Sequence, residues 1–117
     1  MATAELLVDT DVLIDHLRGI RRFAGDVAPV AVSVVTRCEL FAGRDESARL
    51  RRLLGSMVEI GVDAEIAELA GLTRRRFNIA TPDALIAATA LVHGLTLVTR
   101  NRRHFDRVAD LRVRSPD

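Results

Sequence analysis

Three acidic residues and one amide, widely separated in the sequence, are placed where they could share one site. Asp9 ends an apolar segment, Glu39 lies early in a helical stretch after a second one, Asp83 falls in the first turn of a later helix, and Asn101 directly follows a further apolar segment. Carboxylates about 4 Å apart repel each other by roughly 1 to 4 kcal/mol, so three together need a cationic partner. Mg²⁺ or Mn²⁺, hard ions with oxygen ligands, would supply that charge. Such ions activate water against phosphodiesters.

The segments that must position these side chains alternate between strands and helices. Apolar runs predict strands at 5–9, 29–34, 57–62 and 95–99, with a short one at 111–113. Helical spacing predicts helices at 10–18, 45–54, 63–77 and 81–93, and another that carries Glu39 and stops at Gly43. The alternation favours a three-layer α/β fold with a central, mostly parallel sheet flanked by helices. In such a sheet, sites form beyond the carboxyl ends of the strands, where Asp9 and Asn101 are expected.

Length and composition indicate a single domain over residues 1–117. The hydrophobic content is 49%, ample for a folded core. A lone cysteine, Cys38, excludes an internal disulfide and suits a reducing cytoplasm. The sequence has no signal-peptide pattern and no run of ~18 apolar residues, so we expect a cytoplasmic protein without a membrane partner. With three histidines and one cysteine, a zinc site of Cys and His ligands is disfavoured.

Asp9, Asp11 and Asp83 also have structural interpretations. Asp9 is interpretable as a polar strand end, and Asp11 as the N-cap of the next helix or a minor part of a metal shell. Asp83 follows Thr81, the predicted N-cap, with Pro82 at the first helical position. An acid in the first turn favours the helix macrodipole by ~0.3 to 1 kcal/mol, so this placement alone does not require a catalytic role.

Glu39 likewise has a structural alternative. Thr36 and Glu39 fit the capping-box pattern S/T-x-x-E, in which the glutamate bonds a backbone N–H. Ser33 is an equally plausible N-cap, and that choice would move Glu39 into the helix interior. The residues alone leave both arrangements open.

Four segments together resemble one family. The stretches VDTDVLID at 8–15, SVVTRCEL at 33–40, TPDALIAATA at 81–90 and LVTRNRRHF at 97–105 are similar, in the same order, to the sequence blocks of VapC-type PIN-domain proteins. Each block alone is a weak motif, but four in register span nearly the whole chain. The resemblance implies a PIN-like fold and a metal-dependent endoribonuclease that acts as the toxin of a VapBC-type toxin–antitoxin module.

The same resemblance implies the parts of the site and its partners. Asp9, Glu39 and Asp83 would be the metal-binding catalytic acids, with Mg²⁺ or Mn²⁺ as cofactor. The chain would cut RNA, form a homodimer, and be inhibited by a cognate VapB-type antitoxin that inserts a peptide into the acidic cleft. Asn101 would be a fourth catalytic position, which in the family is often Asp, so the resemblance does not imply a fully bound second metal ion in this chain.

Further residues are expected around these acids. Thr10 and Thr99 are predicted to cap or hydrogen-bond next to the metal. All 17 basic residues are arginines, and Arg100, Arg102 and Arg103 are predicted to gather RNA phosphate at the rim of the cleft. A solvated charged loop is the competing interpretation of these three. His104 is expected to be structural or to contact RNA.

Two other functions compete with the nuclease. Asp9 and Asp11 form the D-x-D opening seen in haloacid-dehalogenase-type phosphatases, but those enzymes also use a lysine and this chain has none. A non-catalytic PIN-like module that binds RNA or protein is the stronger alternative. The presence of Asp9, Glu39 and Asp83 argues against a non-catalytic module, whereas Asn101 in place of a fourth acid is compatible with one. Binding of Mg²⁺ or Mn²⁺ separates the two functions.

Overall fold

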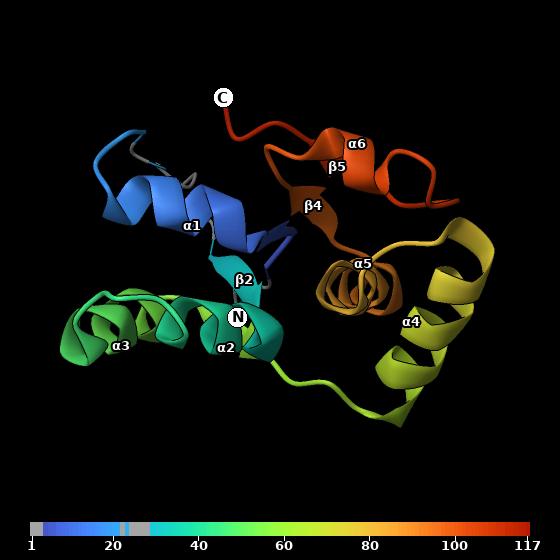
Figure 1. The fold of residues 1–117 in the computed structure, drawn as a ribbon, viewed down its shortest axis with the longest axis horizontal. Coiled ribbons are helices and arrows are strands. Elements are labelled where there is room, and N and C mark those ends of the chain that lie inside the picture. The colour runs from blue at the N-terminus through green and yellow to red at the C-terminus, as the bar shows by residue number, and fades with distance from the viewer. Residues whose placement is uncertain (1–3, 22, 24–28) are drawn as a thin grey trace.

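The computed structural model describes residues 4–21, 23 and 29–117, which form a parallel sheet between two layers of helices (Figure 1). The five strands are β1 (Leu6–Val8), β2 (Val30–Ser33), β3 (Val58–Ile60), β4 (Thr96–Val98) and β5 (Val113–Arg114). They lie in the order β3-β2-β1-β4-β5, and every neighbouring pair is parallel. The predicted α/β class and central parallel sheet are therefore confirmed.

Six helices connect the strands. They are α1 (Thr10–Leu17), α2 (Val34–Phe41), α3 (Ser47–Gly55), α4 (Ala64–Phe77), α5 (Thr81–His93) and α6 (Arg102–Phe105). Helices α1, α2 and α3 cover one face of the sheet, while α5 and α6 cover the other and α4 packs against the outer side of α5 (Figure 1). Among the described residues, no helix has the length and apolar character needed to cross a membrane.

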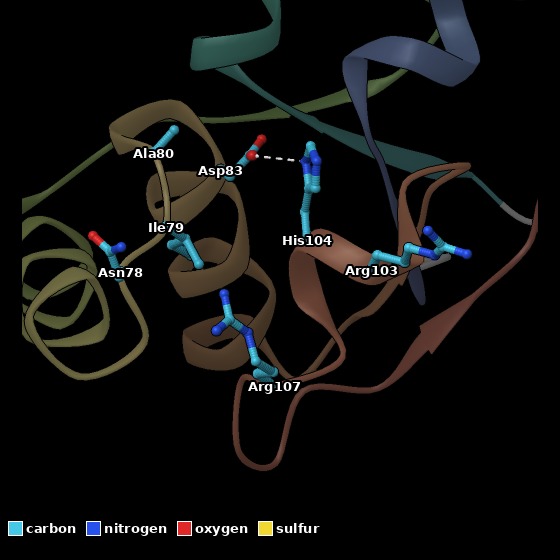
Figure 2. A pocket seen from close by; sticks show the side chains of 7 residues that line it. All are labelled: Asn78, Ile79, Ala80, Asp83, Arg103, His104 and Arg107. Carbon is cyan, nitrogen blue, oxygen red and sulfur yellow. Dashed lines mark ion pairs between the residues drawn. The ribbon is translucent and has the colours of Figure 1, made fainter.

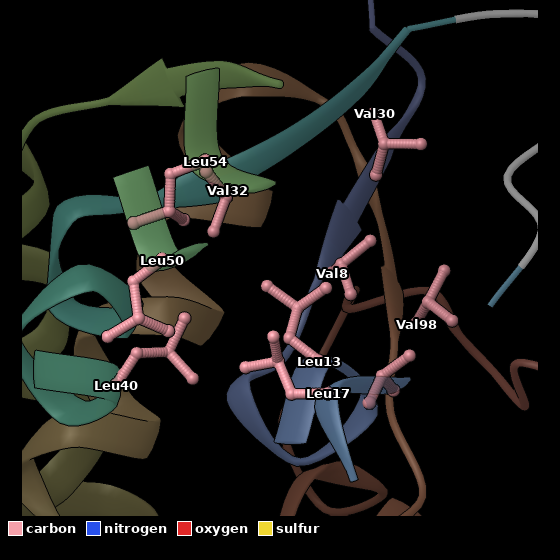
Figure 3. Packing of buried hydrophobic residues seen from close by; sticks show 10 residues of the cluster. Val8, Leu13, Leu17, Val30, Val32, Leu40, Leu50, Leu54 and Val98 are labelled. Carbon is pink, nitrogen blue, oxygen red and sulfur yellow. The ribbon is translucent and has the colours of Figure 1, made fainter. Parts of the chain in front are cut away.

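Strand residues alternate between the two faces, as the period of two requires. Val8, Val32 and Val98 join the core beneath α1, α2 and α3, where Leu50 and Leu54 of α3 are also buried (Figure 3). Each such aliphatic side chain stabilises the fold by about 1.5–3 kcal/mol when fully buried. The three central strands β1, β2 and β4 are buried on both faces, which is why their sequences are apolar runs, whereas the edge strands β3 and β5 are more exposed.

The opposite face forms a second core around α5. Leu7, Ala31 and Leu97 of the strands pack with Ile86 of α5 and Phe105 of α6. The alanine-rich face of α5 lets this helix lie close to the sheet. The helix thereby carries its N-terminal end, and Asp83 with it, to the carboxyl edge of the strands.

The start of α1 differs from the sequence prediction, and the start of α2 matches one of the two alternatives that the sequence left open. Asp9, not Asp11, is the N-cap of α1, because α1 begins directly after β1 and the Asp9 carboxylate accepts from the Thr10 backbone N–H. Ser33 is the N-cap of α2 and accepts from the Val35 N–H. The capping box of Thr36 is therefore wrong, and the alternative with Glu39 inside the helix holds.

The start of α5 and the last strand are also shifted. Ala80, not Thr81, precedes α5, since its carbonyl accepts the first helical bond from Ala84 N at 2.9 Å. The predicted strand at 111–113 instead occupies Val113–Arg114, in register with Leu97 and Val98 of β4. Helix α6 was not predicted.

Candidate active site

Asp9 lies at the carboxyl end of the central strand β1 and is 5% exposed. Its Oδ1 accepts from the Thr10 backbone N–H at 2.8 Å, and its Oδ2 accepts from the Thr99 hydroxyl at 2.7 Å. One carboxylate therefore caps α1 and joins β1 to the end of β4. Both bonds hold the side chain in a single orientation.

The surroundings of Asp9 disfavour its negative charge. Burial, and after it the neighbouring Asp11 carboxylate, raise the pKa of Asp9 from 3.8 to about 6. Hydrogen bonds from Thr99 and Thr10 lower the pKa in part, and the charge of Asp83 raises it a little further. None of these causes is a positively charged side chain, so within the described residues no neighbouring cation balances the charge of Asp9.

Glu39 reaches the same edge of the sheet from α2. Its Oε1 lies 2.7 Å from the Thr10 hydroxyl oxygen, which is also 2.9 Å from the hydroxyl of the fully buried Thr36. A hydroxyl has one proton, so Thr10 donates to Glu39 and accepts from Thr36. Thr10, adjacent to Asp9 in the chain, thereby connects the two predicted metal-binding acids.

Asp83 approaches from the N-terminal end of α5. The negative charge of Asp83 contributes to the raised pKa of Asp9. Asp83 Oδ2 lies 3.3 Å from Nδ1 of His104. The two side chains lie at one end of a pocket of about 250 Å³, in which His104 points toward Asp83 (Figure 2). Both the structural role expected for His104 and its contact to RNA stay predictions.

Asn101 stands at the turn between β4 and α6. Its backbone N–H donates to the Thr99 hydroxyl at 3.0 Å, and that hydroxyl donates in turn to Asp9. Thr99 is completely buried. The exposed side chain of Asn101 makes no capping hydrogen bond, so it is linked to the acids through its backbone alone.

Asp11 and Arg100 fasten this turn to α1. Asp11 Oδ2 accepts from the Arg100 backbone N–H at 3.1 Å, and Arg100 Nε lies 2.6 Å from Asp15 Oδ2. The second contact is an ion pair and not a hydrogen bond, since Arg100 Nε has no hydrogen-bond partner in the described structure. The Arg100 guanidinium is therefore paired with Asp15, and its contact to RNA phosphate stays a prediction.

The other two arginines of this segment fit the predicted rim better. Arg102 and Arg103 are exposed and form no ion pair with any residue in the described part of the chain. Figure 2 shows the Arg103 guanidinium turned away from Asp83. Arg102 and Arg103 thus remain available to a ligand.

Sequence reasoning missed two contributors. Thr36 was considered only as a cap, although it lies three residues before Glu39 and hence on the same helix face, a signal that would have placed it in the site. The sequence does not single out Asp15, because its partner Arg100 is 85 positions away, beyond any spacing rule.

The carboxylate oxygens suit a hard divalent cation, but they are not grouped closely enough in this structure to coordinate one. Over residues 4–21, 23 and 29–117, no three His, Cys, Asp or Glu side chains lie together as a group that could hold a metal ion as they stand. Two observations indicate missing positive charge: the raised pKa of Asp9 and the buried Oδ1 of Asp11, which has no hydrogen-bond partner in the described structure. The carboxylate set therefore fits Mg²⁺ or Mn²⁺ by chemistry.

Comparisons with known proteins agree on the family. A family model described as the PIN domain matches residues 6–111. In Mycobacterium tuberculosis, Ribonuclease VapC19 is 36% identical over 119 residues, covering 90% of this chain and 95% of that protein. Ribonuclease VapC10 of the same organism is 41% identical over 113 residues, covering 86% and 85%.

Solved structures are similar over nearly the whole chain. A chain of a toxin–antitoxin complex from Klebsiella pneumoniae is 33% identical with a TM-score of 0.83, and 98% of each chain is covered. A chain of DNA-bound VapBC from Salmonella typhimurium has a TM-score of 0.86 at 22% identity, with 98% of this chain and 100% of that chain covered. At that identity the second similarity shows the fold alone.

Proposed function

The chain belongs to the PIN-domain family, and from this premise we propose that it is a metal-dependent endoribonuclease with Asp9, Glu39 and Asp83 as its catalytic acids. The observation that carries the proposal is the buried Asp9 carboxylate, whose pKa is raised to about 6 beside Asp11 and Asp83. An uncompensated acid of this kind costs stability unless a ligand supplies positive charge. The relatives called Ribonuclease VapC support RNA as the substrate.

Asp9, Glu39 and Asp83 would hold Mg²⁺ or Mn²⁺. Bound there, the ion supplies a lowered pKa for an attacking water and charge neutralisation at the phosphodiester. Glu39 is exposed and Asp83 half-buried on separate helices, so their carboxylates have room to turn toward Asp9. Asp9 itself is fixed by Thr10 and Thr99, which makes it the reference point of the ligand set.

The remaining residues of the site position the reacting groups. Thr99 holds Asp9 from one side, and Thr10 joins it to Glu39 from the other. Asn101 follows Thr99 at the edge of this cluster, where its free amide is available to RNA. Arg102 and Arg103 attract the phosphate backbone of the strand to be cut.

The proposal includes a toxin–antitoxin setting. Solved structures similar to this chain come from complexes described as toxin–antitoxin or VapBC. We expect a VapB-type antitoxin to bind the chain and suppress its nuclease activity, and the chain to form a homodimer. A cytoplasmic place of action follows, because cellular RNA is the substrate.

Metal-linked stabilisation separates this enzyme from a non-catalytic PIN-like module. Mn²⁺ should raise the Tm of the wild-type protein by several degrees, because a ligand at a hundred times its Kd adds about 2.7 kcal/mol of stability. Glu39→Gln should reduce the shift strongly, while Glu68→Gln, an exposed acid on α4, should keep it. No shift in the wild-type protein, or equal shifts in both variants, would contradict the proposed metal site.

A further inference from the structure

A pocket of about 250 Å³ opens beside Asp83, between the segment joining α4 to α5 and helix α6 (Figure 2). Residues 78–80 form one wall, and Arg103, His104 and Arg107 form the other. Asp83 belongs to both this pocket and the proposed catalytic acids. The pocket is thus a lateral extension of the site, on the α5 side.

The wall at residues 78–80 is held in place by its own chain. Asn78 ends α4 in a left-handed conformation with φ of 53°, and its N–H donates to the Arg74 carbonyl. Arg74 Nε donates to the Ile79 carbonyl at 3.1 Å, and Ile79 is 7% exposed. The pocket therefore exists before any ligand binds, which limits the entropy lost on binding.

The charges around the pocket favour an anion. Arg103 and Arg107 outnumber the single acid Asp83, and neither arginine forms an ion pair with any described residue. Ala80 offers no side-chain cap to α5, so the first N–H groups of this thirteen-residue helix have no side-chain partner there. The partial positive charge of that helix end adds to the two arginines.

The lining also argues against a nucleobase. Its only ring is His104, which points toward Asp83, and no Phe lines the pocket (Figure 2). Base stacking needs an aromatic platform, whereas a phosphate needs cations and N–H donors. Arg107 is exposed and its guanidinium reaches back toward Ile79 across the pocket, while that of Arg103 turns outward (Figure 2).

We infer that this pocket binds a backbone phosphate of the RNA strand adjacent to the one cleaved, with Arg107 as the main contact. This inference rests on the proposed ribonuclease function and extends its substrate path by one subsite. A phosphate held there fixes the strand on the α5 side of the acids. The contact is independent of base identity, so it contributes affinity and register without sequence preference.

The test is RNA binding measured by fluorescence anisotropy on the full chain, with EDTA present so that the RNA stays intact. Arg107→Ala should weaken binding of a short labelled single-stranded RNA by about three- to tenfold at low salt. The slope of log Kd against log salt concentration should fall by about 0.7, the value for one phosphate contact on a single strand. Arg107→Lys should restore most of the affinity.

The matched control is Arg52→Ala, because Arg52 is an exposed arginine on α3, across the sheet from the pocket. It should leave both affinity and salt slope unchanged. An abasic ribose-phosphate strand of equal length should show the same loss with Arg107→Ala. If the loss vanishes on the abasic strand, the pocket holds a base and the inference is overturned.

Two further outcomes keep this inference distinct from the proposed function. Wild-type-like binding by Arg107→Ala, in a protein whose wild type cleaves RNA with Mn²⁺, would overturn the phosphate subsite and leave the nuclease intact. A wild-type protein that neither cleaves nor binds RNA would overturn the proposed function and, with it, the subsite.

Discussion

Asp9 performs two tasks with a single carboxylate. It caps α1 through the Thr10 N–H and is the buried acid around which the proposed metal site is arranged. An asparagine at this position would keep the cap, but its single amide oxygen could not also accept from the Thr99 hydroxyl. The cost of burying the Asp9 charge is visible in its raised pKa.

This cost predicts a pH dependence of stability. The folded state holds the Asp9 proton more tightly than the unfolded state, since the pKa rises from 3.8 to about 6. The stabilising contribution of Asp9 is therefore present below 3.8 and is lost as the pH rises through about 6. Without metal, the free energy of unfolding of Asp9→Asn relative to that of the wild type should therefore rise by at most ~3 kcal/mol across this pH range, about two pKa units of 1.36 kcal/mol each.

Urea unfolding in EDTA at about pH 4.5 and about pH 7.5 measures this difference. The exposed Asp106→Asn is the control and should show no such change. If the difference in unfolding free energy between Asp9→Asn and the wild type is the same at both pH values, the pKa of Asp9 is not raised by burial as described above.

The Thr99 hydroxyl predicts a second residue-scale effect. It donates to Asp9 Oδ2 and accepts from the Asn101 N–H, and it is fully buried. Thr99→Val should leave both partners unsatisfied, lower the free energy of unfolding by about 1–3 kcal/mol, and reduce RNA cleavage. Thr96→Val, at the start of β4, has the same change in chemistry and should be nearly neutral in both denaturant unfolding and cleavage. Equal effects at the two positions would mean that loss of a hydroxyl anywhere in residues 96–99, and not the link to Asp9, is responsible.

At this scale the sequence identified polar residues at strand ends, because a charged residue after an apolar run is conspicuous. It did not reveal which hydrogen bonds they make. Thr10 was expected beside the metal, but its donation to Glu39 depends on how α1 and α2 pack. Thr36 is buried by the same packing, which no local pattern encodes.

Among the elements, the turn from β4 to α6 depends on α1 for its position. Arg100 contributes its backbone N–H to Asp11 and its side chain to Asp15, and the two side chains of the ion pair are 21% and 24% exposed. Arg100 also lies 3.8 Å from Asp117 at the end of the described chain. This turn carries Thr99 and Asn101, so the pair fastens one side of the site to the helix that Asp9 caps.

A double-mutant cycle on Arg100→Ala and Asp15→Ala tests this fastening. The two substitutions should be non-additive by about 0.5–1.5 kcal/mol in unfolding free energy, as for a partly screened pair. Arg100→Ala should also leave the salt slope of RNA binding unchanged, in contrast to Arg107→Ala. A reduced slope would show that Arg100 contacts phosphate after all, as the sequence suggested.

Element boundaries show where sequence rules are strong. Gly94 ends α5 with φ of 66°, and Asp63 caps α4 through the Ile66 N–H, both as the residue types predict. The start of α5 shifted to Ala80 because backbone bonding, not the better capping side chain at Thr81, determines where a helix begins. The four-residue α6 is too short for any periodicity to reveal it.

For the whole molecule, strand order decides which residues meet. β1 lies between β2 and β4, so the residues after these three strands share one edge of the sheet. The alternation of strands and helices predicted the layers, and the rule for parallel sheets predicted the edge. The order itself depends on contacts between distant segments, such as Leu7 with both Ala31 and Leu97, which one sequence does not display.

RNA cleavage by the purified chain tests the central claim most directly. Cellular RNA is incubated with Mn²⁺ or with EDTA, using the wild type, Glu39→Gln and the matched Glu68→Gln, all freed of copurifying antitoxin. We predict discrete cleavage by the wild type and Glu68→Gln with metal, and a loss on the order of a hundredfold or more in Glu39→Gln. No cleavage by the wild type with either Mg²⁺ or Mn²⁺, or undiminished cleavage by Glu39→Gln, would contradict a nuclease centred on Asp9, Glu39 and Asp83.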